Sequence, residues 1–253
     1  MHGVRDQRRR RRRLAATGIA AATLLGASAC GGGDSGTGKD AKAPAASSAK
    51  PSGPAARTEA RLRAAAFGDG ERIGPYTASE YVLDSPLGDG YTAAPAGCQP
   101  LVSLAGDVAD PDPAAQVQRK ADVPDELLGL TVDITLRSYR DGGAATVMKA
   151  LAKAGRDCAG GFTEERAVAR AKYLKVEPAK APAFASEADE AKAYRFTLLD
   201  VKGEKKLYEY LTVVRSGSTT LAFRGEITST EDIGGVPPEI MAAQWAKFRA
   251  AGG

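Results

Sequence analysis

Residues 206–224 decide the fold class of this 253-residue chain: Lys206-Leu-Tyr-Glu-Tyr-Leu-Thr-Val-Val-Arg-Ser-Gly-Ser-Thr-Thr-Leu-Ala-Phe-Arg224. Apolar side chains recur with the period of a half-buried strand: Leu207, Leu211 and Val213 before a turn, and Leu221 and Phe223 after it. Glu209 is the exception on that face. Ser216-Gly217 is a tight-turn signal between the two runs. The stretch therefore predicts two antiparallel strands joined by a hairpin.

Two earlier stretches show the same alternation: Val132, Ile134 and Leu136 in one, and Tyr194, Phe196 and Leu198 in the other. A turn around Gly203 leads from the second of these into the hairpin. Residues 171–177 predict one further strand. Strands that follow one another this closely pair antiparallel, so a meandering sheet is expected.

Helical spacing of apolar residues from Ala144 to Leu151 predicts a helix, with Asp141-Gly-Gly offering its N-cap and Gly155 closing its C-terminus. Pro237-Pro238 opens a closing helix, because proline suits the first helical turn. Residue propensity favours a third helix over residues 57–66, whereas residues 105–126 are acidic and proline-rich and are expected to form a loop. This order predicts an α+β fold, an antiparallel sheet of about five strands with helices packed on one face.

The first strand of the hairpin has two tyrosines on the face whose surroundings the sequence does not decide. Tyr208 and Tyr210 share the face opposite Leu211 and Val213. Either a second layer of structure covers them, or they are exposed for binding. Both are candidate ligand-binding residues.

Residues 1–29 have the pattern of a signal peptide. Residues 1–13 hold seven arginines against the single acid Asp6, and residues 14–29 carry no charge. This apolar stretch of 16 residues is shorter than the roughly 20 residues that a membrane-spanning helix needs. The arginine run fits either a basic general secretory signal or a twin-arginine signal.

The end of this segment resembles a bacterial lipobox, in which small residues precede a cysteine that is diacylated. Ala27-Ser28-Ala29 precede Cys30, although Ala27 stands where leucine is usual. Acylation of Cys30 would anchor the chain to the membrane. Ordinary cleavage near Ala29 would instead leave Cys30 free. Residues 30–56 are then the lipidated cysteine and a flexible linker rich in Gly, Ala, Ser and Pro, and residues 57–253 form a single domain.

The charge balance argues against nucleic acid as a partner. The chain carries 35 basic and 31 acidic residues, but residues 1–29 hold seven of the basic ones and one acid. The remainder has 28 basic and 30 acidic residues and is slightly acidic. The apparent basicity therefore belongs to the signal segment.

Two cysteines remain after Cys30. Cys98 and Cys158 form an even pair in an oxidising compartment, which favours a disulfide. Such a bond would close a loop of about 60 residues and contribute about 4 kcal/mol in the chain-entropy account. Two buried free thiols or a redox pair are the alternatives.

The residues offer little for catalysis. His2 is the only histidine and lies in the signal segment, so the rest of the chain has no histidine base or metal ligand. We therefore expect no enzyme activity, no cofactor and no metal. A carboxylate-based hydrolase is the remaining enzymatic alternative.

Several segments together resemble the PknH-like extracellular sensor domain family. They are Cys98-Gln-Pro-Leu101, Cys158-Ala-Gly-Gly-Phe162, Val213-Val-Arg-Ser-Gly217 and the closing helix. The resemblance covers roughly residues 75–250. Members of this family are attached to receptor-like kinases or stand alone as lipoproteins, and no kinase segment is present here. They usually carry two disulfides, whereas this chain has cysteines for one beyond Cys30.

The resemblance implies an antiparallel sheet with flanking helices and a cleft for an extracellular ligand. The expected function is thus a membrane-anchored extracytoplasmic lipoprotein with a sensor-like ligand-binding domain. Its ligand would be a small molecule, a lipid or a cell-wall fragment. A lipoprotein that docks on another envelope protein is the alternative.

Overall fold

The computed structural model describes residues 53–81, 91–103, 111–124, 129–166, 169–227 and 229–253. The predicted signal segment, Cys30 and the linker up to residue 52 lie outside the described residues. Ala55, near the end of the predicted linker, already contacts the domain, because its carbonyl oxygen accepts a hydrogen bond from Ser218 Oγ at 3.0 Å.

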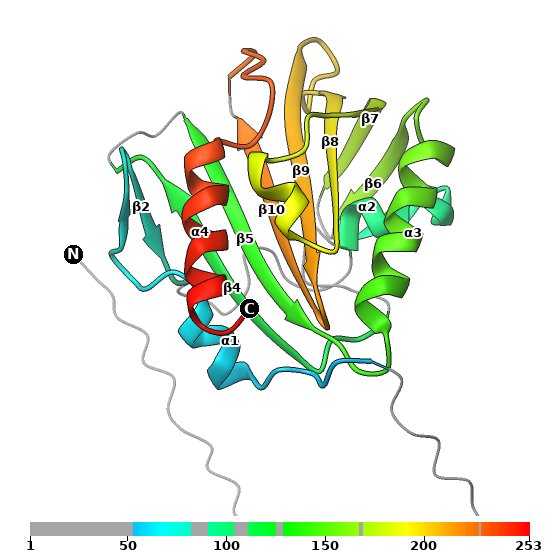
Figure 1. Cartoon of the computed structure of the whole chain (residues 1–253). Helices are drawn as coiled ribbons and strands as arrows, with labels where there is room; N and C mark the ends of the chain where they lie inside the picture. The colour runs from blue at the N-terminus through cyan, green and yellow to red at the C-terminus, as the bar shows by residue number, and fades with distance from the viewer. Residues whose placement is uncertain (1–52, 82–90, 104–110, 125–128, 167–168, 228) are drawn as a thin grey trace, which may run out of the picture. The chain divides into compact units, whose positions relative to one another are not determined.

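The strands form one antiparallel sheet in the order β1-β2-β4-β5-β10-β9-β8-β7-β6-β3 (Figure 1). Their bounds are β1 Arg72–Ile73, β2 Tyr76–Ser79, β3 Thr92–Ala94, β4 Ala115–Asp122, β5 Leu130–Ser138, β6 Phe162–Arg166, β7 Ala169–Pro178, β8 Glu190–Leu199, β9 Lys206–Ser216 and β10 Thr219–Ile227. The α+β class and the antiparallel sheet are confirmed. The expected count of about five strands is wrong, since the sheet has ten.

Strand β4 shows why the count was too low. It lies within the stretch expected to be a loop, and its inward positions include the charged Arg119. Arg119 is accommodated because its Nε donates to the carbonyl oxygen of Phe67 at 2.7 Å and its guanidinium pairs with Glu80 at 2.7 Å. A paired charge at a buried position hides the alternation that predicts a strand.

Four α-helices accompany the sheet: α1 Glu59–Ala65, α2 Gln99–Ser103, α3 Gly143–Asp157 and α4 Pro238–Ala250. Two short 3-10 helices are η1 Ala96–Cys98 and η2 Ala183–Glu187. The expected segment Asp141-Gly-Gly opens α3, with Gly142 at the N-cap and Asp141 before it with a φ of 51°. Asp141 and Gly142 both take the left-handed conformation, which Asp and Gly tolerate best.

The helices cover both faces of the sheet, so the expectation of helices on one face is also wrong. On β9, Leu211 and Val213 belong to a core with α3, whereas Tyr210 and Val214 belong to a second core with α1 and α4. Because adjacent strand residues point to opposite faces, the two cores lie on opposite sides of the sheet. We call these the α3 face and the α4 face.

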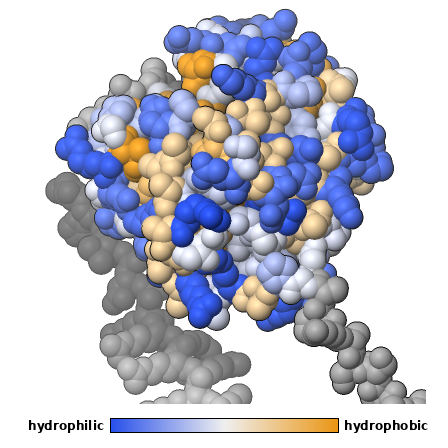
Figure 2. Space-filling view, viewed as in Figure 1, coloured by the Kyte–Doolittle hydropathy of each residue, from blue (hydrophilic) through white to orange (hydrophobic). Residues whose placement is uncertain are grey.

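The visible surface is mostly hydrophilic (Figure 2). Among the described residues, the exposed large apolar side chains are Val201 and Ile233. None of the helices in this part of the chain is long and apolar enough to span a membrane.

Candidate functional site

A pocket of about 570 Å³ lies on the α4 face. Its walls come from β9, the loop that precedes α4, the first turn of α4 and the segment between β7 and η2. Residues of mixed character line it, including Tyr210, Tyr76, Pro182, Val236, Met241 and Lys180. This volume and this mainly apolar lining with a few polar groups are typical of small-molecule sites.

Tyr210 is the polar anchor of the pocket wall. Its hydroxyl donates a hydrogen bond to Asp232 Oδ1 at 2.5 Å and accepts one from the backbone N–H of Gly234 at 3.2 Å. Gly234 N–H also donates to Asp232 Oδ1 at 3.0 Å. These bonds hold the loop before α4 against β9, in a turn where Gly234 has a φ of 81°.

The same contacts fix the protonation of both groups. Burial, together with the hydrogen bond to Asp232, raises the pKa of Tyr210. The hydrogen bond from Tyr210 lowers the pKa of Asp232. The wall therefore presents a neutral phenol beside an ionised carboxylate.

Tyr208 and Tyr210 share one face of β9, as their spacing predicts, but they have different surroundings. Tyr210 is buried, so a second layer covers it. Tyr208 is half-buried, and its ring lies under the guanidinium of Arg195, 5.6 Å from the ring centre. Arg195 in turn pairs with Asp232 and with Glu177. The structure thus brings only Tyr210 to the pocket wall.

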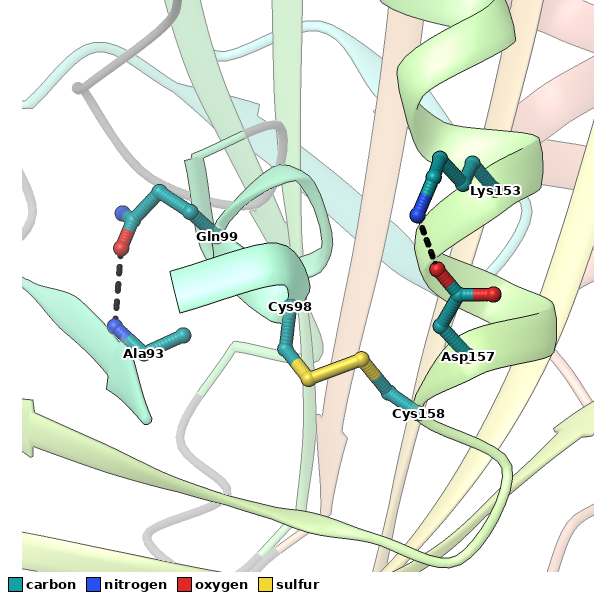
Figure 3. The surroundings of a disulfide bond; sticks show 6 residues. All are labelled: Ala93, Cys98, Gln99, Lys153, Asp157 and Cys158. Carbon is teal, nitrogen blue, oxygen red and sulfur yellow. Dashed lines mark hydrogen bonds and ion pairs between the residues drawn. A yellow bond between two sulfur atoms is a disulfide. The ribbon is translucent and has the colours of Figure 1, made fainter. Parts of the chain in front are cut away.

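Cys98 and Cys158 form a disulfide between the end of η1 and the residue that follows α3 (Figure 3). Both are buried. Gln99 supports the same corner: its side-chain oxygen accepts from the backbone N–H of Ala93 at 2.8 Å, and its amide nitrogen donates to the carbonyl of Tyr91 at 2.9 Å. The disulfide thus joins the corner of α2 and β3 to the C-terminus of α3. Its buried position indicates a structural role.

A buried polar cluster on the α3 face was not foreseen from the sequence. It contains Glu164 of β6, Tyr173 of β7, Glu209 of β9 and Arg224 of β10. Glu209, the exception in its apolar alternation, is buried because Arg224 on the next strand pairs with it at 2.8 Å. A charged residue on an apolar strand face, followed by an opposite charge across the hairpin, is the signal that would have found this pair.

These carboxylates do not line the pocket on the α4 face or either of two further pockets of the described domain. A pocket of about 520 Å³ lies where residues 53–59 cross the domain near Arg140. A smaller one, of about 210 Å³, lies beside Arg63, Glu80 and Arg119. Within the described ranges, no group of three or more His, Cys, Asp or Glu side chains is placed to hold a metal ion.

Comparison with known proteins gives a structural match only. The sequence matches no protein-family model and no curated protein. Its structure is similar to the extracellular domain of PknH from Mycobacterium tuberculosis, with a TM-score of 0.51 and 11% identity over 78% of this chain and 98% of that domain. A putative uncharacterized protein from Mycobacterium smegmatis scores only 0.36, at 14% identity over 75% of this chain and 94% of that one. The described domain therefore has the fold of the PknH extracellular domain.

Proposed function

We propose that this chain is an extracytoplasmic lipoprotein, anchored through Cys30, whose domain is a sensor-like module without catalytic activity. It binds a small molecule, a lipid or a cell-wall fragment beside Tyr210. The location is supported by the basic and apolar signal segment, by the cysteine that follows it, and by a fold shared with an extracellular domain.

The pocket on the α4 face is the observation that carries ligand binding. It combines apolar walls with a phenol whose position is fixed by Asp232 and Gly234. Such pre-organised polar groups in an apolar cavity give orientation without a large ordering cost. The buried carboxylates lie outside it, which favours binding over carboxylate-based hydrolysis.

The first described residues lie away from this pocket. The first described residues contact the turn between β9 and β10, where Ser218 bonds to Ala55. Tyr210 and Ser216 are six positions apart on β9, a distance of about 20 Å at roughly 3.3 Å per residue. Figure 1 shows the chain entering at one end of the sheet and the loop before α4 at the other. The pocket therefore lies at the end of the sheet opposite the point where the chain enters the described domain.

Filling the pocket tests this proposal. Gly235 lines it, and a Cβ added there would meet no atom within 4 Å, so Gly235→Trp can fill space without straining the fold. The full chain, purified from its native membranes, is examined by native mass spectrometry. Wild type should retain a noncovalent ligand that Gly235→Trp has lost.

Gly160→Trp is the matched control, because Gly160 is also open to an added Cβ and lies outside the pocket. It should retain the ligand. Equal retention by both variants would place the ligand elsewhere. A wild-type chain free of ligand, which also fails to take up added muropeptides or lipids, would overturn the proposal.

Exposed Ile233 at the pocket rim favours a second candidate, docking on an envelope protein. Ile233 is 43% exposed, whereas most large apolar side chains of the domain are buried. An apolar side chain at a rim suits a protein contact as well as a ligand contact. Crosslinking from this position separates the two.

A further inference from the structure

The polar cluster on the α3 face contains one phenol between two carboxyl groups. Tyr173 Oη lies 2.8 Å from Glu164 Oε2 and 2.8 Å from Glu209 Oε2. A guanidinium nitrogen of Arg224 lies 3.2 Å from the same phenol oxygen and 2.8 Å from Glu209 Oε2. Glu164 is 1% exposed, so water does not separate it from the cluster.

A count of protons shows that two ionised carboxylates do not fit this geometry. A phenol has one proton, so Tyr173 can donate to only one of the two oxygens. The other oxygen, at the same distance, makes a favourable contact only if it carries a proton and donates it to the phenol oxygen. Two unprotonated oxygens at 2.8 Å would repel each other in a site that excludes water.

The charged groups around the cluster also favour a protonated carboxyl group. Arg224 pairs with Glu209 at 2.8 Å and with Glu226 at 2.9 Å, and it lies 4.0 Å from Glu164. Three carboxyl groups therefore surround one guanidinium. On the strand beyond β10, Asp133 adds a fourth carboxyl, which accepts a hydrogen bond from Tyr81.

Lys120 on β4 faces Asp133 across the strand pair. Its positive charge lowers the pKa of Asp133. It forms its own ion pair with Asp122 at 2.9 Å. The belt of charges from β4 to β6 therefore holds more acidic than basic groups among the residues named. Such like-charge crowding favours retention of a proton.

We propose that the carboxyl–phenol cluster of Glu164, Tyr173 and Glu209 binds one proton in the folded domain at neutral pH. The proton closes the contact between β6–β7 and β9–β10. Acidification therefore tightens the domain, and loss of the proton at alkaline pH loosens these strands. This gives an extracytoplasmic domain a response to the pH of its surroundings that does not depend on the pocket.

The direction of the pH effect follows from burial. Burial raises the pKa of Glu209, and the attraction of Arg224 opposes this only in part. A carboxyl whose pKa is higher in the folded than in the unfolded state binds its proton more tightly when folded. Its contribution to stability is complete at low pH and is lost as the pH rises through the folded-state pKa.

Infrared spectroscopy of the full chain tests the proposal directly. Asp133 is first replaced by Asn, because burial raises its pKa as it raises that of Glu209. At neutral pH this chain should show the C=O stretch of one protonated, buried carboxyl group. The band should vanish in the further variant Glu164→Gln with Glu209→Gln. Absence of the band in the parent chain would overturn the proposal.

The thermal midpoint provides a second readout. In the Asp133→Asn chain it should fall as the pH rises from about 5 to about 9, and Glu209→Gln should remove most of that fall. Glu165→Gln is the control, since Glu165 is the exposed neighbour on β6 that pairs with Arg170. It should keep the full pH dependence. A Glu209→Gln chain that folds and still shows the full fall would overturn the proposal.

Discussion

The two faces of the sheet are built differently. The α4 face has a pocket, and its key polar group, Tyr210, bonds to an exposed loop through Asp232 and Gly234. The α3 face has a disulfide and a charged cluster whose members bond to one another. The phenol at the pocket is held in place beside an open cavity, whereas the polar groups of the cluster are buried against one another. We therefore expect the α4 face to bind the ligand and the α3 face to carry the disulfide and the response to pH.

The largest expected effect comes from the core of the α4 face. Phe223 is fully buried in the core of the α4 face. Phe223→Ala should lower the free energy of unfolding by about 3–5 kcal/mol, because it leaves a cavity. Val201→Ala, at a side chain that is 95% exposed, should change it by less than about 0.5 kcal/mol. Denaturant unfolding measures both, and a Phe223→Ala loss below about 1 kcal/mol would contradict the described packing.

Removing the disulfide should weaken the α3 face. The double variant Cys98→Ala with Cys158→Ala should lower the free energy of unfolding by about 2–5 kcal/mol. Hydrogen exchange should rise in α2 and at the C-terminus of α3 but stay unchanged in the loop before α4. Equal exchange increases on both faces would show that the two sides are not separate.

Asp133 makes stability depend on pH in the unusual direction. Burial raises its pKa from 3.8 to about 6, so the folded state holds the proton to a higher pH than the unfolded state. The contribution of Asp133 to stability should therefore rise by roughly 1–3 kcal/mol as the pH falls from about 7.5 to about 4. Asp133→Asn should flatten this part of the profile. Chemical denaturation across this pH range checks it, and an unchanged slope in the variant would refute it.

The smallest effect distinguishes the two tyrosines. Tyr210→Phe removes the hydroxyl that bonds Asp232 and Gly234, and should cost about 1 kcal/mol. Tyr208→Phe removes no hydroxyl that fixes this loop and should be nearly neutral, since the ring under Arg195 remains. Ligand retention should fall only in Tyr210→Phe. The opposite ranking would move the site toward Tyr208.

The regular parts of the fold could be predicted because their sequences alternate cleanly. Strand β5, the β9–β10 hairpin and α4 all lie where apolar periodicity places them. Strand β4 was missed because the buried Arg119 interrupts its pattern. Helices on both faces were missed because β9 is apolar on both sides, through Val213 and Val214, which a one-sided alternation does not reveal.

The candidate site could be predicted only in part. Tyr210 was identified from its position on the face opposite Leu211, but its partner Asp232 lies 22 residues away in a loop. Glu209 stood out in the sequence without its partners, because Glu164 and Tyr173 come from strands that only the folded sheet brings near it. Contacts between distant strands depend on strand order, which local periodicity does not encode.

Photocrosslinking in living cells tests the central claim, ligand binding beside Tyr210, most directly. A photoreactive phenylalanine analogue replaces Ile233 at the pocket rim, and the irradiated chain is analysed by mass spectrometry. We predict a single small-molecule, lipid or glycan-fragment adduct that Gly235→Trp suppresses, on a chain whose N-terminal Cys30 is diacylated. A protein adduct that persists in Gly235→Trp, or an irradiated chain without any adduct, would contradict the account.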